Sequence, residues 1–298
     1  MKVVVGASSF AGSSDKALNM LLDKGIEVVK NPYGRKMSEE EIIEHLKGAD
    51  GLLAGLEPLS EKVFSAASRL KAVARIGIGM DSVDADAAKR HGIKVSNTPD
   101  APTEAVAEMA LAALLTMGHE IIPSNADMHN KVWKKRIGFS LKELNVLFIG
   151  YGRIGRRFGE HLKYFGSNII VYDPYQPDIS EKSLKEALGK ADVITLHASG
   201  KEEILTTELF NHMKAGVVIM NCSRGGLINE TALYESLKSG KVSKFWGDVF
   251  WEEPYQGKLL ECDNAILTPH ISTYNSLCRE SMETEAVKNL LEDLGYVE

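Results

Sequence analysis

The chain has 298 residues, more than one hydrophobic core usually supports, so two compact domains are expected. Its 44% hydrophobic and 26% charged residues are ordinary for a globular protein, and its net charge of −6 gives no electrostatic reason to expect a nucleic-acid ligand. No apolar run approaches the roughly 18 residues of a membrane span or a signal segment, and the three cysteines lack disulfide or metal-ligand spacing, so we expect a cytoplasmic protein without membrane contact or bound metal.

Strand-like and helix-like segments alternate along the chain, which predicts α/β architecture with two doubly wound parallel sheets. The first series predicts helices near residues 15–24, 38–47 and 60–68, and strands at 2–5, 27–30, 51–54, 71–76 and 93–96. Five strands favour a smaller, flavodoxin-like unit. The second series predicts strands at 145–149, 168–172, 192–197, 216–221, 244–249 and 264–268, six strands that match a dinucleotide-binding fold.

Two long helical patterns connect these series. The stretch APTEAVAEMALAALLTM has a proline in its first turn at Pro102 and is apolar on most sides, so we expect a buried connecting helix. The closing stretch SLCRESMETEAVKNLLEDLGY has a second helical pattern that could return the chain to the first domain.

A glycine pattern at residues 146–158, VLFIGYGRIGRRF, follows a strand and opens a helix, the context in which G-x-G-x-x-G indicates a dinucleotide site. Gly150 allows the tight turn, Gly152 lets backbone N–H groups approach a pyrophosphate, and Gly155 lets the helix pack close to the strand. The phosphates would then lie at the positive end of the helix dipole.

Asp173 ends the next strand at the spacing of a ribose-binding carboxylate. A carboxylate accepts hydrogen bonds from the 2′-hydroxyl of NAD but repels the 2′-phosphate of NADP, and no arginine follows within 174–177, so we predict NAD as the cofactor. The alternative is a turn-forming aspartate before Pro174.

Three later segments carry residues suited to hydride-transfer chemistry, each just past a predicted strand. Arg224 could bind a substrate carboxylate or carbonyl through paired N–H donors. His270 could act as acid/base, because histidine titrates near neutrality, and Glu253 could fix its tautomer and favour its protonated form. Each residue taken singly has a plainer interpretation: Arg224 at a turn, Glu253 as a solvated loop carboxylate, and His270 as a backbone cap.

The order and context of these motifs resemble the D-isomer-specific 2-hydroxyacid dehydrogenases, which include glycerate, 3-phosphoglycerate and glyoxylate/hydroxypyruvate enzymes. The resemblance covers nearly the whole chain and rests on RIGIGMDSVD (75–84), the helix with Ala107 and Glu108, GYGRIG (150–155), NCSRGGLINE (221–230), DVFWEEP (248–254) and TPHIS (268–272). Two departures are Ala198 after His197, where the family often has proline, and Ser82, where asparagine is usual.

The resemblance implies Arg224, Glu253 and His270 as the catalytic set. It implies a substrate domain of residues 1–98 and 275–298, with a Rossmann NAD domain at 99–274 inserted into it, and a homodimer. It also implies that backbone N–H groups of Gly77, Ile78 and Gly79 bind the substrate carboxylate. Besides the glycines and Asp173, the cofactor would contact Arg153, Ile154, His197 and Asp248.

The predicted reaction is the interconversion of a small 2-oxo acid and its D-2-hydroxy acid with NAD. Phosphoglycerate dehydrogenases carry arginines after the strand that corresponds to 51–54, whereas this chain has Gly55, Leu56 and Glu57. A phosphate there would meet Glu57 and no obvious cation, which favours glycerate/hydroxypyruvate or glyoxylate over the alternative, 3-phosphoglycerate. An alternative of another class is an NAD-sensing binding protein, similar to the C-terminal-binding transcriptional corepressors.

Overall fold

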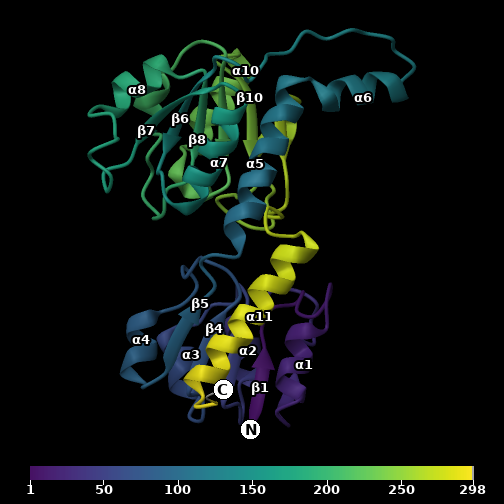
Figure 1. Ribbon diagram of the computed structural model, residues 1–298, viewed down its shortest axis with the longest axis vertical. Coiled ribbons are helices and arrows are strands. Elements are labelled where there is room, and N and C mark those ends of the chain that lie inside the picture. Colours follow the sequence, from purple (N-terminus) through teal and green to yellow (C-terminus); the bar gives the residue numbers. More distant parts are fainter. Residues whose placement is uncertain (297–298) are drawn as a thin grey trace. The chain divides into compact units, whose positions relative to one another are not determined.

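The structure is a computed structural model that describes residues 1–296, so the last two positions of the predicted range 275–298 lie outside the described residues. The chain forms two compact units (Figure 1). Unit 1 comprises Met1–Pro102 and the segment from Thr273 onward, and unit 2 comprises Thr103–Ser272. The bounds of unit 2 lie four and two residues inside the predicted 99–274.

Unit 1 contains a five-stranded parallel sheet in the order β2-β1-β3-β4-β5, the flavodoxin-like order. Its strands are β1 Lys2–Val5, β2 Glu27–Val29, β3 Gly51–Ala54, β4 Ala72–Arg75 and β5 Lys94–Asn97. The central strands β1, β3 and β4 are mostly apolar and buried because helices cover the sheet on both faces. These helices are α1 Lys16–Leu22, α2 Glu39–His45, α3 Glu61–Ala66, α4 Ala85–Arg90 and α11 Ser276–Asp293.

Helix α4 was not predicted, although it has a local start signal. The Asp84 side chain caps the helix by accepting the Ala87 N–H at 2.8 Å. Ala87 and Ala88 then pack into the core of unit 1 beside α3. Six residues give too little hydrophobic periodicity to identify a helix from the sequence.

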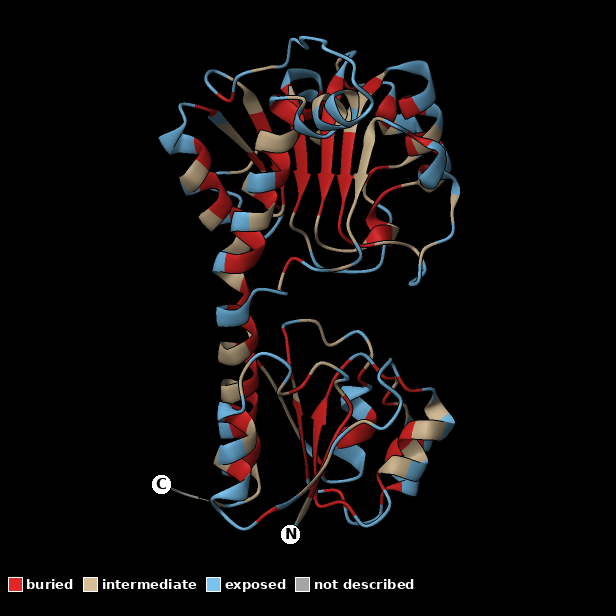
Figure 2. Ribbon diagram, turned by 90° about the vertical axis from the view of Figure 1, so that its right-hand side faces the viewer, coloured by how far each residue is buried: buried red, intermediate tan, exposed pale blue. Residues whose placement is uncertain are grey.

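Unit 2 contains six parallel strands in the order β11-β10-β9-β8-β6-β7. The central strands are mostly buried, whereas the edge strands β11 and β7 are mostly only partly buried (Figure 2). Its strands are β6 Asn145–Ile149, β7 Asn168–Tyr172, β8 Val193–Leu196, β9 Val217–Asn221, β10 Val242–Gly247 and β11 Ala265–Leu267. The usual six-stranded order is 3-2-1-4-5-6. Here the third strand in sequence pairs directly with the first, on the side opposite the second, and the topological switch point falls between β6 and β8.

Alternate residues of β6 divide the core of unit 2 into two layers. Val146 and Phe148 pack with α5 Pro102–Gly118 and α7 Arg153–Tyr164, and Leu147 and Ile149 pack on the other face. The second face is covered by α8 Leu184–Lys190, α9 Thr207–Phe210 and α10 Glu230–Ser239. Two short 3₁₀ turns, Gly225–Leu227 and Lys258–Glu261, complete the unit.

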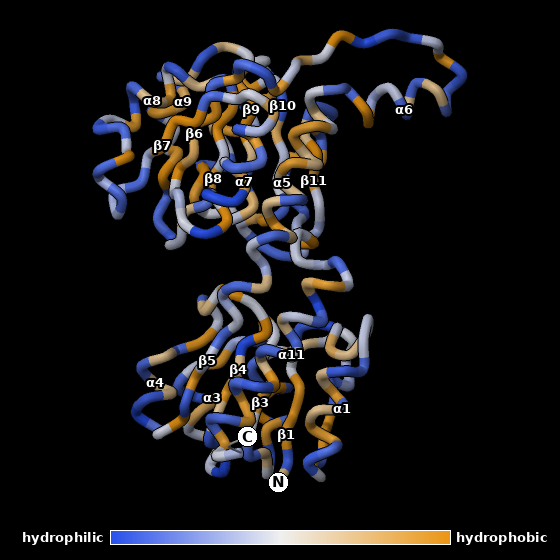
Figure 3. Tube along the Cα trace, in the orientation of Figure 1, coloured by the Kyte–Doolittle hydropathy of each residue, from blue (hydrophilic) through white to orange (hydrophobic). Residues whose placement is uncertain are grey.

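Helix α6, Ile121–His129, was also not predicted, and it leads into an exposed segment at 130–140. In Figure 3 this segment extends from unit 2 as a hydrophilic chain interrupted by apolar positions. Trp133 is 81% exposed and Ile137 is 98% exposed. Among residues 1–296 no single helix has the length and apolar character to cross a membrane, although α5 and α6 together, bent by 59°, meet that test by length and composition.

Candidate active site

One row of paired residues crosses the whole sheet of unit 2 at the carboxyl ends of its strands. The row consists of Tyr172, Ile149, Leu196, Asn221, Gly247 and Leu267. The predicted site residues of unit 2 follow members of this row by one to six positions. Register in the sheet therefore gathers at one edge residues that are far apart in the sequence.

The turn after β6 requires glycine for steric reasons. Gly150 has φ of +85°, and a Cβ there would lie 2.7 Å from the Ala198 nitrogen. A Cβ on Gly155 would lie 2.9 Å from the Gly150 carbonyl oxygen, so its absence lets α7 start close to the strand. Gly152 is the N-cap of α7, and the space beside its Cα is open.

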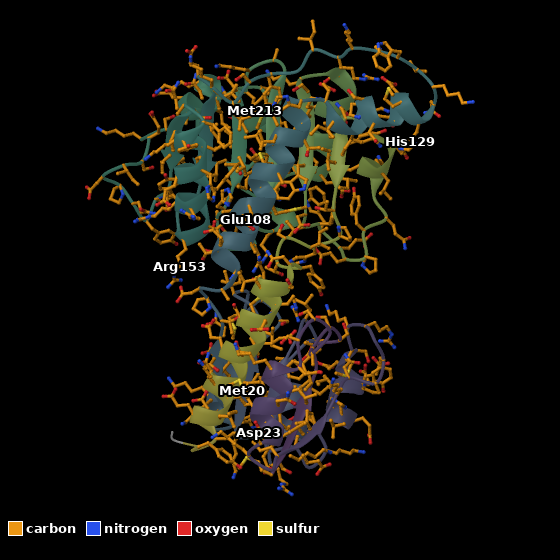
Figure 4. All side chains as sticks on the ribbon, turned by 45° about the vertical axis from the view of Figure 1, so that its right-hand side comes forward. Met20, Asp23, Glu108, His129, Arg153 and Met213 are labelled. Atoms are coloured by element: carbon orange, nitrogen blue, oxygen red, sulfur yellow. The ribbon has the colours of Figure 1, made fainter. Side chains whose placement is uncertain are left out.

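The start of α7 fits a dinucleotide pyrophosphate. Arg153 and Ile154 occupy the first turn of α7, where backbone N–H groups point out of the N-terminal end of a helix. Figure 4 shows Arg153 at this end of α7, at the edge of unit 2. The open approach at Gly152 and the helix dipole favour an anion here, and the pyrophosphate contact stays a prediction.

Asp173 binds the glycine turn from the end of β7. Its buried carboxylate accepts the Tyr151 N–H at 2.8 Å, the Tyr175 N–H at 2.9 Å and Gln176 Nε2 at 3.1 Å. The bond from Tyr175 is the turn-forming role that was considered as the alternative. A carboxylate offers about four acceptor positions, so a ribose hydroxyl would use what remains or displace the Gln176 amide.

His197 packs against the glycine turn. Its ring stacks on Phe148 with centroids 5.6 Å apart, and Nε2 lies 2.9 Å from the Thr195 hydroxyl. Burial lowers the pKa of His197 to about 3, so the ring is neutral at physiological pH. Burial also raises the pKa of the neighbouring Cys222 thiol to about 12, so this cysteine is an inert thiol. The cofactor contact predicted for His197 stays a prediction.

Arg224 follows β9 in a turn organised by Asn221. The Asn221 side chain accepts the Ser223 N–H at 3.1 Å and donates to the Arg224 carbonyl at 2.8 Å. Gly225 then approaches the segment after β10 so closely that a Cβ would overlap the Phe250 carbonyl. The segments that carry Arg224 and Glu253 therefore lie in direct backbone contact.

Asp248 organises the segment that carries His270. Its buried carboxylate accepts hydrogen bonds from the Thr268 hydroxyl at 2.6 Å, the Ile271 N–H at 2.9 Å, and both the N–H and the hydroxyl of Ser272. These bonds hold His270 at φ of +54°, a conformation that costs free energy for a residue other than glycine. Asp248 was predicted to contact the cofactor, and the structure shows it as the anchor of this turn.

Glu253 and His270 form a pair in which Glu253 Oε2 lies 2.9 Å from His270 Nδ1. The other oxygen of Glu253 accepts the Phe250 N–H at 3.2 Å. The carboxylate places the imidazole proton on Nδ1, so Nε2 is the nitrogen that can exchange a proton with a ligand. The predicted pair of Glu253 and His270 is thus in contact, and its catalytic role stays a prediction.

In unit 1 the glycine loop after β4 offers fewer amides than predicted. The Gly77 N–H donates to the Thr98 hydroxyl at 2.7 Å and is therefore committed within the protein. Within residues 1–296 the N–H groups of Ile78 and Gly79 have no protein acceptor. The carboxylate-binding prediction accordingly narrows to Ile78 and Gly79.

The expectation that a phosphate near β3 would meet Glu57 and no cation is wrong. Glu57 is 1% exposed, its carboxylate accepts the Gly55 N–H at 3.0 and 3.1 Å, and burial raises its pKa. Arg75 at the end of β4 pairs in register with Ala54, and a Cβ on Gly77 would overlap its guanidinium. Sequence reasoning overlooked Arg75 because the residue is a neighbour across the sheet and not along the chain.

Two parallel-sheet units, a glycine turn followed by an aspartate, and a carboxylate–imidazole pair are together typical of nucleotide-dependent dehydrogenases. Residues 111–272 match the D-isomer specific 2-hydroxyacid dehydrogenase NAD binding domain, and residues 8–149 match the catalytic domain of the same family. The chain belongs to the D-isomer specific 2-hydroxyacid dehydrogenase family and carries its NAD-binding domain. The predicted family, fold class and NAD cofactor are confirmed.

Named relatives and a solved structure agree with this assignment. D-3-phosphoglycerate dehydrogenase of Methanocaldococcus jannaschii is 39% identical over 250 residues, which cover 78% of this chain and 48% of that enzyme. Hydroxypyruvate reductase of Thermotoga maritima is 33% identical over 273 residues, or 87% of this chain and 89% of that enzyme. A crystal structure of a protein from Thermus thermophilus has a TM-score of 0.89 and 31% identity, covering 99% of this chain and 97% of that chain. The chain spans about half the length of the first relative and nearly all of the second.

Proposed function

We propose that the protein is an NAD-dependent oxidoreductase that interconverts a small 2-oxo acid and its D-2-hydroxy acid. The contact of 2.9 Å between Glu253 and His270, on the same sheet edge as the glycine turn, is the observation that carries this proposal. A paired acid/base and a dinucleotide site at one edge are what carbonyl reduction by hydride transfer requires.

Each residue of the set has a defined task in the reductive direction. NADH held at the glycine turn and Asp173 would supply a hydride for the carbonyl carbon. Arg224 binds the 2-oxo acid through its guanidinium. The carboxylate-binding role of Ile78 and Gly79 in unit 1 stays a prediction. Protonated His270 donates the proton from Nε2 to the carbonyl oxygen, while Glu253 stabilises the imidazolium until the transfer occurs. Gly150, Gly152, Arg153, Ile154, Gly155 and Asp173 form the cofactor site, supported by His197 and Asp248.

Hydroxypyruvate/glycerate or glyoxylate are the proposed substrates, and 3-phosphoglycerate is the alternative. The segment after β3 exposes Leu56, 45% accessible, which favours an uncharged substrate end. Arg75 is the reason that 3-phosphoglycerate stays an alternative substrate, because its guanidinium beside Gly77 could bind a phosphate. Hydroxypyruvate reductase of Thermotoga maritima is also among the relatives, at 33% identity over 87% of this chain.

A panel of 2-oxo acids with NADH and NADPH, followed by nicotinamide absorbance, tests the activity, and the reverse panel compares D-glycerate with 3-phosphoglycerate. We expect turnover of hydroxypyruvate or glyoxylate with NADH. If the phosphorylated acid is the better substrate, its kcat/KM exceeds that of D-glycerate and falls selectively in Arg75→Gln. Binding of NADH without turnover of any acid would refute the enzyme proposal and favour the binding-protein alternative.

We also propose a homodimer, supported by the exposed apolar residues of α6 and the 130–140 segment. Ile121, Ile122 and Met128 are each at least half exposed, and Trp133 and Ile137 are more exposed still. Such residues gathered on one segment indicate an interaction surface. Sedimentation of the protein and of Trp133→Glu tests this: a dimer that the substitution dissociates supports the proposal, and a monomeric protein refutes it.

A cytoplasmic location is proposed on the state of the cysteines. Cys222, Cys262 and Cys278 are free thiols within residues 1–296. Reduced thiols are typical of cytosolic proteins.

A further inference from the structure

Two aromatic side chains join the segment that carries Glu253 to the segment that carries Arg224. The Trp251 indole N–H donates to the Ile228 carbonyl at 2.8 Å, and the Tyr255 hydroxyl donates to Glu230 Oε1 at 2.6 Å. Trp251 and Tyr255 lie on either side of Glu253 in the sequence, and both acceptors follow Arg224. The two hydrogen bonds therefore attach the loop that carries Glu253, on both sides of this residue, to the segment that follows Arg224.

The packing around Tyr255 fits this bond closely. Its ring stacks on Phe250 with centroids 4.5 Å apart and planes 20° apart, and its oxygen accepts the Leu259 N–H at 3.1 Å. A Cβ on Gly257 would overlap both the Tyr255 hydroxyl and Glu230. Close packing on the ring and on the hydroxyl leaves the Tyr255 side chain little freedom.

The Glu253–His270 contact itself gives weak orientation. Both side chains are about two-fifths exposed, and a solvent-exposed ion pair gains little because water screens it and both side chains lose freedom. Besides His270, the carboxylate contacts the Phe250 N–H at 3.2 Å, a long hydrogen bond. The loop that carries Glu253 therefore contributes to the position of the pair.

We propose that Trp251 and Tyr255 are positioning residues that clamp the 250–255 loop onto the 224–230 segment, so that Glu253 stays on His270 Nδ1 and Arg224 keeps a fixed reach. The expected effect of the clamp on catalysis rests on the proposed function. Its expected effect on the surroundings of the His270 imidazole can be measured without turnover.

Single substitutions remove each bond while retaining an aromatic ring. Tyr255→Phe removes one hydroxyl, and Trp251→Phe removes the indole N–H. Tyr234→Phe is the matched control, because the Tyr234 hydroxyl also donates to a glutamate, Glu261, at 3.2 Å in the same unit but outside both segments. If one clamp variant fails to fold, the other still removes one of the two hydrogen bonds and tests the proposal.

The first measurement is the imidazole titration of His270 by proton NMR, assigned with His270→Asn. In both clamp variants we expect the titration midpoint to move to lower pH, in the same direction as in Glu253→Gln, because the carboxylate no longer holds the imidazolium. Tyr234→Phe should leave the midpoint unchanged. An unchanged midpoint in both clamp variants overturns the proposal, whatever the activity of the protein.

The second measurement is steady-state kinetics with the 2-oxo acid that the wild type reduces. We expect kcat to fall about tenfold in each clamp variant, because small displacements of a catalytic group have large effects on rate. The KM for NADH should stay the same, and the alkaline fall in activity should move to lower pH. Wild-type kcat in both variants, or a loss that is matched by Tyr234→Phe, overturns the clamp. An inactive wild type would refute the proposed function alone, and the NMR titration would then decide on the clamp.

Discussion

Replacing Asp248 by asparagine tests whether the buried carboxylate anchors the turn that carries His270. Oδ1 accepts Thr268 and Ile271, and Oδ2 accepts the N–H and hydroxyl of Ser272. Whichever way the asparagine amide turns, its NH2 group faces a backbone N–H donor. At least one buried N–H then loses its acceptor, and the remaining bonds lose the assistance of the negative charge.

The loss should total about 2–4 kcal/mol, from one unsatisfied buried donor at about 1–3 kcal/mol and weaker remaining bonds. In a unit of this size that lowers Tm by roughly 5–10 °C, and a displacement of His270 near 1 Å lowers kcat about 100-fold. Calorimetry and kinetics measure both, with Ser272→Ala as a graded control that removes one hydroxyl bond and costs about 1 kcal/mol. A wild-type Tm with a raised KM for NADH would refute the anchoring role and favour the predicted cofactor contact.

Three further predictions concern individual side chains. Asp173→Ala should weaken NADH binding and narrow the preference over NADPH, and equal use of both cofactors by the wild type would contradict this. His270→Ala should lose most of kcat while NADH still binds by fluorescence titration, and Glu253→Gln should move the alkaline fall of reduction to lower pH; an unshifted profile would reject the pair. Because burial lowers the pKa of His197 to about 3, the unfolded state binds the extra proton below about pH 6.5, so stability should fall by about 2 kcal/mol between pH 6.5 and 5, and His197→Phe should flatten that slope in urea unfolding.

Most strands of the fold could be predicted because their sequences are buried apolar runs ended by turn residues. Four predicted strands have the same bounds as the observed ones, namely 2–5, 51–54, 145–149 and 168–172. The other predicted strands overlap the observed ones. The order of strands was harder to predict. Six strands suggested the usual dinucleotide-binding order, but nothing in the sequence of β7 or β8 shows on which side of β6 each one pairs.

The candidate site also has residues that could be predicted from the sequence and contacts that could not. Glu253 and His270 were identified by motif, and the structure places them in contact. The hydrogen-bond partners of the Asp248 carboxylate and the Gly77 N–H could not be predicted from the sequence. An aspartate whose carboxylate is buried in the protein and one whose carboxylate faces the cofactor look the same in a sequence. The Trp251 and Tyr255 bonds join segments more than 20 residues apart, which the pairing of β9 with β10 brings together.

Sheet register explains why a site spread over about a hundred residues can form at one edge. Ile149, Leu196, Asn221, Gly247 and Leu267 are paired partners from strand to strand, so each following loop starts at the same level. The one irregularity among these pairings, at Val242 and Lys244, lies at the opposite end of β10 and leaves the row intact. A shift of one residue in any of these strands would turn its side chains to the other face and displace the loop that follows. The buried strand interiors therefore set the positions of the site residues, and loops such as 250–255 make the final adjustment through their own contacts.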